Sequence, residues 1–599
     1  MLRFDALNCR CGQSPWLTRK KRGSGLKRAI LAVCALLIAG AAPAQELKTP
    51  RISDVQVDWN AAAASIADGP AGTPSEVFAR LNAAAGIVFP GIAESAVPVL
   101  LPYDVDAFIK DRATHSDVPA EKIVEHAERF LRSDFRATRF FAAGPAGYDS
   151  AFALTIPGTP GLSDINYAEP VYVLLSGLSM VYELDGPALP EGEPVKSLEA
   201  EFPGIRRYLH ESYIRYSFER YGATYVAAIY CLDTRPRRKI LTCKQADRVM
   251  ERFLRALKLS GGKPSDKPQA HDAFSLERPA DTSRDFTYFS PGFLIPNTGL
   301  KKETGGRADY TIYARLRFPL KEPPAFANSQ SFNNWGDCDF TGRSVRHPRR
   351  KDQPYSCTVN GRPLVFNEAA PGNYSYPWRD NFCEHRRYFV GQCPGGEGHQ
   401  GQDIRPSSCS LFNDGADRCQ PYRHDVVAAH DGLILRAPKQ EAVYLFINTP
   451  AAHVRVRYMH MNPSQLDADG ILSGRLVHEG EVIGKVGNYN SGERGTTYHL
   501  HFDMQVPTKA GWVFVNPYMT LVSAYERLIG ARGVEIKDGD PVPVTVGVPP
   551  IILHPSDQPS VGQASVQTDA SAAREKPHKA KEKLRKKRKH VRKRRRHDD

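Results

Sequence analysis

The spacing of hydrophobic residues changes along the chain and predicts two kinds of folded region. Between about residues 76 and 275, segments with helical spacing, such as 77–85 and 120–132, alternate with apolar runs typical of buried strands, such as 171–175. From residue 396 to 525, candidate strands recur at roughly ten-residue spacing, and helical patterns are few. The sequence therefore predicts an α+β N-terminal domain followed by an all-β domain with an antiparallel sheet core.

Individual elements follow from the same patterns. Residues 225–232 and 239–243 are predicted to form the two strands of a hairpin, with a helix after it at 244–259. The cysteine-bearing, aromatic-rich segment 325–395 is interpreted as a loop-rich region whose aromatic side chains pack together. A groove that receives an extended polymer is the alternative for that segment. Alternating apolar and polar positions predict strands at 310–318, around 425–435, and at 443–448, 454–460 and 481–487.

Composition divides the chain further. The lead-in 45–75 and the polar stretch 260–285 are rich in turn-forming residues and are predicted to be loose. The resulting prediction has five parts: a signal peptide at 1–44, an α+β domain of unknown role at 45–275, a cysteine- and aromatic-rich β extension at 286–395, an all-β core at 396–530, and a disordered linker with a basic tail at 538–599.

The N-terminus has the layout of a secretory signal. A basic region ends at Arg28, an apolar run spans 29–42, and Ala42-Pro43-Ala44 follows as a small-residue cleavage site. The apolar run is shorter than the roughly twenty residues that a membrane span needs. We therefore expect export to the periplasm, the cell envelope or the medium, with an uncleaved anchor as the alternative.

Positive charge is concentrated at the two ends of the chain. The whole chain carries +14, of which residues 1–28 contribute +7 and residues 574–599 contribute +11, so the remainder carries −4. The C-terminal run is expected to stay extended through self-repulsion and to attract polyanions without sequence preference. For an exported protein, anionic envelope polymers or lipids are the expected partners, and nucleic acid is not expected. A solubilising tail without a partner is the alternative.

Eight of the eleven cysteines lie beyond the signal, an even number that suits an oxidising compartment. Sequential pairing would close four loops of similar size, although eight cysteines allow 105 pairings. A zinc–cysteine site is disfavoured because the chain has no C-x-x-C pair. The sequential pairs are 231–243, 338–357, 383–393 and 409–419.

Three short motifs in the C-terminal half carry the candidate chemistry. They are G-H-Q-G-Q-D at 398–403, R-Y-M-H at 457–460 and H-L-H-F at 499–502. Alternation along a strand places His499 and His501 on one face. Two imidazoles, joined by a histidine and an aspartate from a distant segment, suit a zinc ion with a position open to water.

In their order and spacing, these motifs resemble the lysostaphin/LytM-type zinc metallopeptidases, which use H-x-x-x-D, Tyr-x-His and H-x-H. The resemblance covers roughly 396–520 and implies a LytM-like fold for the core. It implies that His399, Asp403 and His501 bind one Zn2+ per chain. It also implies that His460 and His499 are the catalytic pair beside the metal.

The family implies an exported zinc metalloendopeptidase that hydrolyses peptide cross-links of bacterial peptidoglycan. The residues alone imply zinc-assisted amide hydrolysis. One alternative is a non-catalytic cell-wall binding or activator protein on the same fold, and another is a metallopeptidase with a protein substrate. The bond that is cut and the oligomeric state are not predicted.

Two departures from the family pattern bear on the substrate groove. An insertion at 407–423 carries Cys409 and Cys419 and is expected to form a stapled loop beside the metal. Tyr498 replaces the small residues usual before H-x-H and is expected to lean into the groove. Other histidines of this region are expected to be ordinary polar residues, apart from His385, which is left open: His424, His430, His453 and His478.

Overall fold

The computed structural model describes most of the chain between residues 46 and 540. The predicted signal at 1–44 and most of the predicted tail at 538–599 lie outside the described residues. None of the helices in the described part is long and apolar enough to cross a membrane. The described residues are 46–66, 72–115, 118–132, 134–155, 171–186, 189, 191–210, 213–231, 241–265, 271–294, 306–328, 374–384, 386, 388, 390–394, 396–406, 421–493, 495–537 and 540, with the backbone of 337–338, 357–359 and 362–363.

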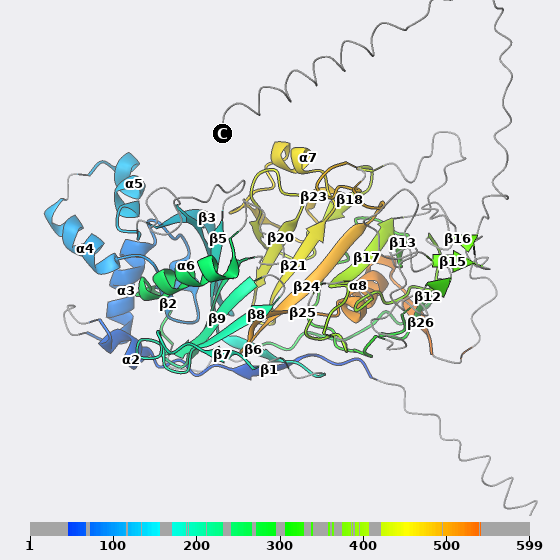
Figure 1. Ribbon diagram of the computed structural model, residues 1–599, viewed down its shortest axis with the longest axis horizontal. Helices are drawn as coiled ribbons and strands as arrows, with labels where there is room; N and C mark the ends of the chain where they lie inside the picture. The colour runs from blue at the N-terminus through cyan, green and yellow to red at the C-terminus, as the bar shows by residue number, and fades with distance from the viewer. Residues whose placement is uncertain are drawn as a thin grey trace, which may run out of the picture. The chain divides into compact units, whose positions relative to one another are not determined.

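A seven-stranded antiparallel sheet with the order β3-β4-β5-β10-β9-β8-β7 forms the centre of the N-terminal region (Figure 1). Helix α6 (Cys243–Arg255) packs against β9 and β10 and buries Val249, Phe253 and Leu254. Each such burial contributes on the order of 2 kcal/mol. The strands are β3 (Phe135–Gly144), β4 (Gly147–Leu154), β5 (Tyr172–Leu178), β7 (Glu193–Pro194), β8 (Arg206–His210), β9 (Tyr213–Arg220) and β10 (Ala223–Tyr230).

Smaller elements complete this region. Two antiparallel strand pairs join β1 (Arg51–Asp54) to β6 (Met180–Glu183) and β2 (Val99–Leu101) to β11 (Lys258–Gly261). The helices are α2 (Trp59–Ala64), α3 (Pro74–Ala85), α4 (Val105–Thr114) and α5 (Ile123–Glu128), with 3-10 turns at Ile92–Glu94 and Ala120–Lys122.

Capping explains where two of the helices begin. Thr73 and Glu76 form a capping box at α3, so the predicted helix at 77–85 is confirmed with an extra N-terminal turn. Thr242 and Gln245 form another at α6. The predicted hairpin strand at 239–243 is therefore wrong in its described part, since Thr242 caps the helix that Cys243 begins. Strand β10 pairs with β5 and β9 instead.

The C-terminal region is built on a second antiparallel sheet, with the order β13-β17-β24-β21-β20-β19-β22 and β25 added beside β24. The strands predicted at 443–448 and 454–460 are confirmed, the second one residue earlier. The sheet consists of β13 (Ala325–Ala327), β17 (Gly401–Pro406), β19 (Gly432–Leu435), β20 (Val443–Asn448), β21 (His453–Met459), β22 (Leu476–Val477), β24 (Leu500–Thr508) and β25 (Gly511–Val515).

Further elements flank this sheet. Strand β12 (Thr282–Phe289) runs parallel to β26 (Arg532–Ile536), and β18 (Asp425–Val427) pairs antiparallel with β23 (Val482–Lys485). Helix α8 (Tyr518–Ile529) lies in the same hydrophobic cluster as the sheet, and α7 (Pro463–Ala468) follows β21. A small sheet joins β14 (Asp337–Cys338), β15 (Cys357–Val359) and β16 (Arg362–Pro363).

Two other local predictions are wrong. Residues 310–318 form no continuous strand and make only an isolated bridge, from Thr311 to Lys48. Residues 45–75 are not wholly loose, because they contain β1 and α2.

Aromatic packing in the extension follows the preferred interpretation. The ring of Trp378 lies 4.9 Å from Phe286 and 4.7 Å from Tyr525 of α8, and the Tyr376 and Tyr525 hydroxyls are 2.5 Å apart. Trp378 is fully buried. These rings hold the extension on the C-terminal sheet.

Two of the four predicted disulfides are present in the described residues. They join Cys231 to Cys243, with S–S 2.07 Å, and Cys383 to Cys393, with S–S 2.12 Å. The side chains of the pairs 338–357 and 409–419 lie outside the described residues. In the backbone, Cys338 stands opposite Cys357 in the register of β14 and β15.

A buried polar chain joins the two sheets. Nε2 of His453 in β21 lies 2.8 Å from the carboxylate of Asp149 in β4, and both residues are buried. Ser176 Oγ donates to the same carboxylate at 2.5 Å and accepts from Trp512 Nε1 at 3.0 Å. Leaving a buried hydrogen-bonding group without its partner typically costs about 1–3 kcal/mol. His453 thus links two regions of the chain that are about 300 residues apart in sequence.

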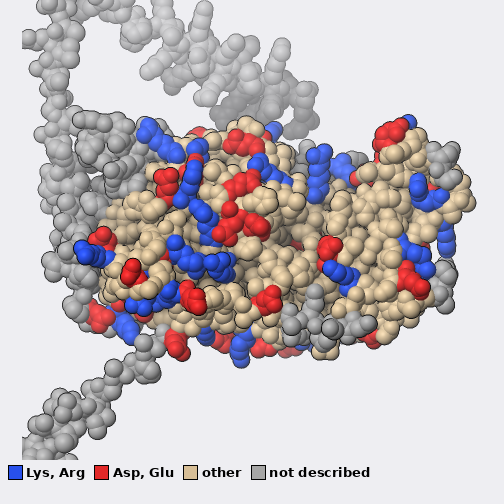
Figure 2. Space-filling view, turned by 180° about the vertical axis from the view of Figure 1, so that it is seen from behind, with Lys and Arg blue, Asp and Glu red and all other residues tan. Residues whose placement is uncertain are grey.

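Charged side chains on the face shown in Figure 2 are of both signs and interspersed. Neither Lys and Arg nor Asp and Glu form a continuous field on that face, in keeping with the small net charge of the chain between its basic ends.

Candidate active site

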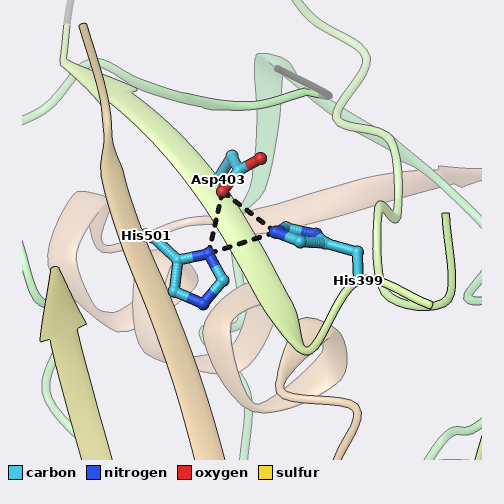
Figure 3. Close-up of side chains that lie close together, drawn as sticks. All are labelled: His399, Asp403 and His501. Atoms are coloured by element: carbon cyan, nitrogen blue, oxygen red, sulfur yellow. Dashed lines mark hydrogen bonds and ion pairs between the residues drawn. The ribbon is translucent and has the colours of Figure 1, made fainter. Parts of the chain in front are cut away.

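Three predicted ligands meet at the junction of two strands (Figure 3). Asp403 in β17 stands opposite His501 in β24 in the strand register, and His399 lies in the segment that leads into β17. His501 Nδ1 lies 3.1 Å from both Asp403 Oδ1 and His399 Nε2, and His399 Nε2 lies 3.3 Å from Asp403 Oδ1. Among the described residues, these three form the one cluster with metal-ligand spacing.

Hydrogen bonds on the outer side of the cluster fix both ring tautomers. His399 Nδ1 donates to the carbonyl of Asn381 at 2.9 Å, and His501 Nε2 donates to Asp503 Oδ2 at 3.0 Å. In the neutral rings the nitrogens that face inward then carry lone pairs, beside the Asp403 carboxylate. Burial lowers the pKa of His501, but its contacts with Asp403 and Asp503 outweigh it and raise the pKa above its usual value, so without a metal its Nδ1 can hold a proton between the acceptors. A cation can take the place of that proton, and two imidazoles with one carboxylate are a set that zinc accepts.

An arginine keeps the partner of His501 ionised. Arg457 in β21 stands opposite Asp503 in β24, and its Nε donates to Asp503 Oδ2 at 2.6 Å. Burial raises the pKa of Asp503, but Arg457 and the His501 contact outweigh it and lower the pKa below its usual value. Arg457 also donates to Gln400 at 3.0 Å. Such contacts are typical of the outer shell that orients a metal-ligating histidine, the role predicted for His501.

The predicted catalytic pair lies beside the cluster. The rings of His460 and His499 have centroids 4.7 Å apart, and His499 Nε2 is 3.5 Å from Asp403 Oδ1. His460 Nδ1 donates to the carbonyl of Tyr489 at 2.8 Å, and His499 Nδ1 donates to that of Thr497 at 2.7 Å. In both rings Nε2 is therefore left as an acceptor.

Burial keeps both imidazoles neutral. It lowers the pKa of His460 to about 4 and that of His499 well below its usual value. A neutral imidazole with a free Nε2 can accept a proton from water. His460 follows β21 with φ +73, a left-handed conformation uncommon outside glycine that often marks functional positions.

Sequence reasoning missed a carboxylate next to this pair. Glu441 Oε1 lies 3.8 Å from His460 Nδ1, and its Oε2 accepts from the Ser491 amide at 3.3 Å. Burial raises the pKa of Glu441 to about 7. Glu441 lies in the connection between β19 and β20, far from every motif, so no sequence signal pointed to it.

The raised pKa of Glu441 predicts a pH-dependent cost to stability. The folded state holds this proton up to about pH 7, whereas the unfolded chain loses it near the ordinary glutamate pKa of 4.5. Stability is therefore lost as pH rises through that window, by up to about 3 kcal/mol. Glu441→Gln should remove this loss. The free energy of unfolding of the variant, measured in urea, should therefore rise relative to that of the wild type between about pH 5 and pH 8. The exposed control Glu121→Gln should show the same pH dependence of the free energy of unfolding as the wild type. A Glu441→Gln curve that runs parallel to the wild-type curve would contradict the raised pKa of Glu441.

Tyr498 does not lean into a groove. It is fully buried in the hydrophobic cluster of the sheet, so the prediction is wrong. The insertion at 407–420 and His385 lie outside the described residues. Of the remaining histidines, His478 is exposed, 3.7 Å from Asp431, and His453 is the buried partner of Asp149 described above.

A family model matches the part of the chain around H-x-H. The sequence model of Peptidase family M23 matches residues 411–517, a segment that contains His460, His499 and His501 and begins after Asp403. A search of the curated proteins finds no match. A crystal structure of a candidate glycyl-glycine endopeptidase lytM from Ruminococcus gnavus is 22% identical, covering 23% of this chain and 50% of that chain, with a TM-score of 0.16. The match thus spans half the length of that protein.

Proposed function

We propose that this chain, which carries a peptidase domain of family M23, is an exported zinc metalloendopeptidase that cuts peptide cross-links of bacterial peptidoglycan. The observation that carries the proposal is the convergence of His399 Nε2, Asp403 Oδ1 and His501 Nδ1 as three acceptors. Two neutral imidazoles lie next to that cluster, which is the arrangement that hydrolysis of an amide requires.

In this proposal, His399, Asp403 and His501 hold one zinc ion. One carboxylate and two neutral imidazoles leave the ion a net charge of +1. The bound ion supplies Lewis acidity, which polarises a carbonyl and makes water a better nucleophile. Asp503 and Arg457 keep His501 oriented with its lone pair inward.

His460 and His499 handle protons. Both are fixed by Nδ1–H donation to a carbonyl, so Nε2 of either ring can take the proton of the attacking water. The imidazolium formed can then stabilise the developing oxyanion or return the proton to the leaving amine. The low exposure of both residues, 8% for His460 and 2% for His499, limits competition from bulk water.

Two further features support the proposed export and the proposed attachment to the cell envelope. The signal-like residues 1–44 and the Cys231–Cys243 and Cys383–Cys393 bridges suit an oxidising compartment outside the cytoplasm. The basic run at 574–599 suits attachment to anionic envelope polymers or lipids.

The test is incubation of the purified full chain with murein sacculi. We expect release of muropeptides, its loss with a zinc chelator, and its recovery on adding zinc. An unfolded protein is treated in parallel. Cleavage of that protein without muropeptide release would favour a protein substrate, and no cleavage of either under any metal condition would favour a non-catalytic cell-wall protein.

A further inference from the structure

We propose that Asn381 is a positioning residue that sets two of the candidate metal ligands, His399 and Asp403, through separate atoms. Its main-chain carbonyl accepts from His399 Nδ1 at 2.9 Å, and its side-chain Oδ1 accepts from the amide N–H of Asp403 at 3.0 Å. The inference rests on the proposed metal site. Asn381 lies 30 residues before the segment that matches the peptidase family, so the family match assigns it no role.

The two contacts do different things. The carbonyl fixes the ring tautomer of His399, so that Nε2 presents a lone pair to the cluster, and any residue at this position could supply it. The side-chain contact fixes the backbone at Asp403, from which the carboxylate points at the two histidines. Only a side chain with a correctly placed acceptor can make that contact.

Asn381 is itself held by a fully buried polar hub. The carboxylate of Asp380 accepts from the amides of Gly292 at 2.7 Å and Phe382 at 2.9 Å. It also accepts from the side-chain amides of Gln402 and Asn516, both at 2.6 Å. Gln402 Oε1 in turn accepts from the Asn381 amide at 3.1 Å. Asn381 is therefore held by residues of β17 and of the end of β25, in addition to its contacts with the candidate ligands.

The disulfide-linked segment holds His399 from the other side. The amide of Cys383 donates to the His399 carbonyl at 2.9 Å, and the amide of His399 donates to the Glu384 carbonyl at 2.8 Å. The Cys383–Cys393 bridge closes this segment. His399 thus has its backbone and its ring fixed by residues 381–384, which makes this segment part of the site.

The side chain of Asn381 allows a clean test. Its Nδ2 is buried and has no hydrogen-bond partner among the described residues, and within that part of the chain Oδ1 is the one side-chain atom that makes a hydrogen bond. Asn381→Ala removes that acceptor and leaves the main-chain carbonyl. Asn381→Asp keeps an acceptor for the Asp403 amide. Asn448→Ala is the matched control, because Asn448 makes two comparable contacts, at 2.8 Å with Ala146 and 2.9 Å with Gly147, away from the cluster.

The measurement is zinc affinity of the full chain by chelator competition, together with unfolding of the zinc-free protein. We expect Asn381→Ala to bind zinc about 10- to 100-fold more weakly. Asn381→Asp should bind zinc more tightly than Asn381→Ala, because an acceptor for the Asp403 amide remains at this buried position. Asn448→Ala should lower stability and leave zinc affinity unchanged.

Unchanged zinc affinity in Asn381→Ala, with or without loss of stability, would overturn the inference and show a merely structural role. So would an equal loss of affinity in Asn448→Ala. None of these readouts uses peptidoglycan. A wild type that binds one zinc and cuts no sacculi would contradict the proposed function while the role of Asn381 stands.

Discussion

Replacing Asp403 with alanine should abolish zinc binding and lower peptidase activity by about 10³-fold or more. Asp403 is the one anion of the cluster, and its Oδ1 lies within 3.5 Å of the ring nitrogens of His399, His499 and His501. Its burial, with 1% of the side chain and backbone exposed, means that water cannot replace the lost ligand charge easily. The two remaining imidazoles would have to bind a divalent ion in a buried site that no longer offers a carboxylate ligand to offset the charge of the ion.

Zinc content by metal analysis and release of muropeptides are the two measurements. Asp425→Ala is a suitable control, since Asp425 is also a strand aspartate but pairs with Lys321 and Lys485 at the surface. We expect one zinc per chain in the wild type and in the control. A full zinc equivalent in Asp403→Ala would show that another set of side chains holds the metal.

The fold of the C-terminal region follows closely from its sequence because its strands alternate cleanly. Residues 443–448 form β20 at the predicted bounds, since Val443, Leu445 and Ile447 face the main C-terminal cluster while Phe446, on the other face, packs against Phe140 of β3. By contrast, 310–318 alternates equally well but makes only an isolated bridge. An alternating pattern shows which face of a segment is apolar. It does not show whether a neighbouring strand of matching length is available to pair with that segment.

The residues of the candidate site were predictable for a different reason. His399, Asp403, His460, His499 and His501 stand in three motifs whose order resembles a known family, and the structure brings all of them together. The same alternation that places His499 and His501 on one face places Tyr498 on the opposite, buried face. The expectation for Tyr498 overlooked that rule.

The outer shell was not predictable from sequence. Asn381 and Asp380 lie in a cysteine-rich segment without periodicity. Asn381 contacts His399 and Asp403 directly, and Asp380 contacts Gln402 and Asn516. Arg457 meets Asp503 only because β21 and β24 pair in one particular register. Such contacts depend on strand order and register across long sequence separations, which local patterns do not encode.

Replacing His460 or His499 with alanine should lower kcat by about 10²- to 10⁴-fold while leaving one zinc per chain. Both rings lie next to the cluster, and neither is among the three residues with mutual metal-ligand spacing. Because both act on the same proton transfers, the double variant should lose much less than the product of the two single losses.

The zinc content of these variants separates the two histidines of H-x-H, which share one strand face. His501 directs Nδ1 at the cluster because Asp503 holds its Nε2–H, whereas His499 donates its Nδ1–H to Thr497 and leaves Nε2 free. We expect His501 to be the ligand and His499 the proton acceptor because His501 has metal-ligand spacing with His399 and Asp403, whereas His499 is not part of that cluster. Loss of zinc from His499→Ala would reverse the assignment, and muropeptide release at the wild-type rate by His499→Ala would exclude it from catalysis.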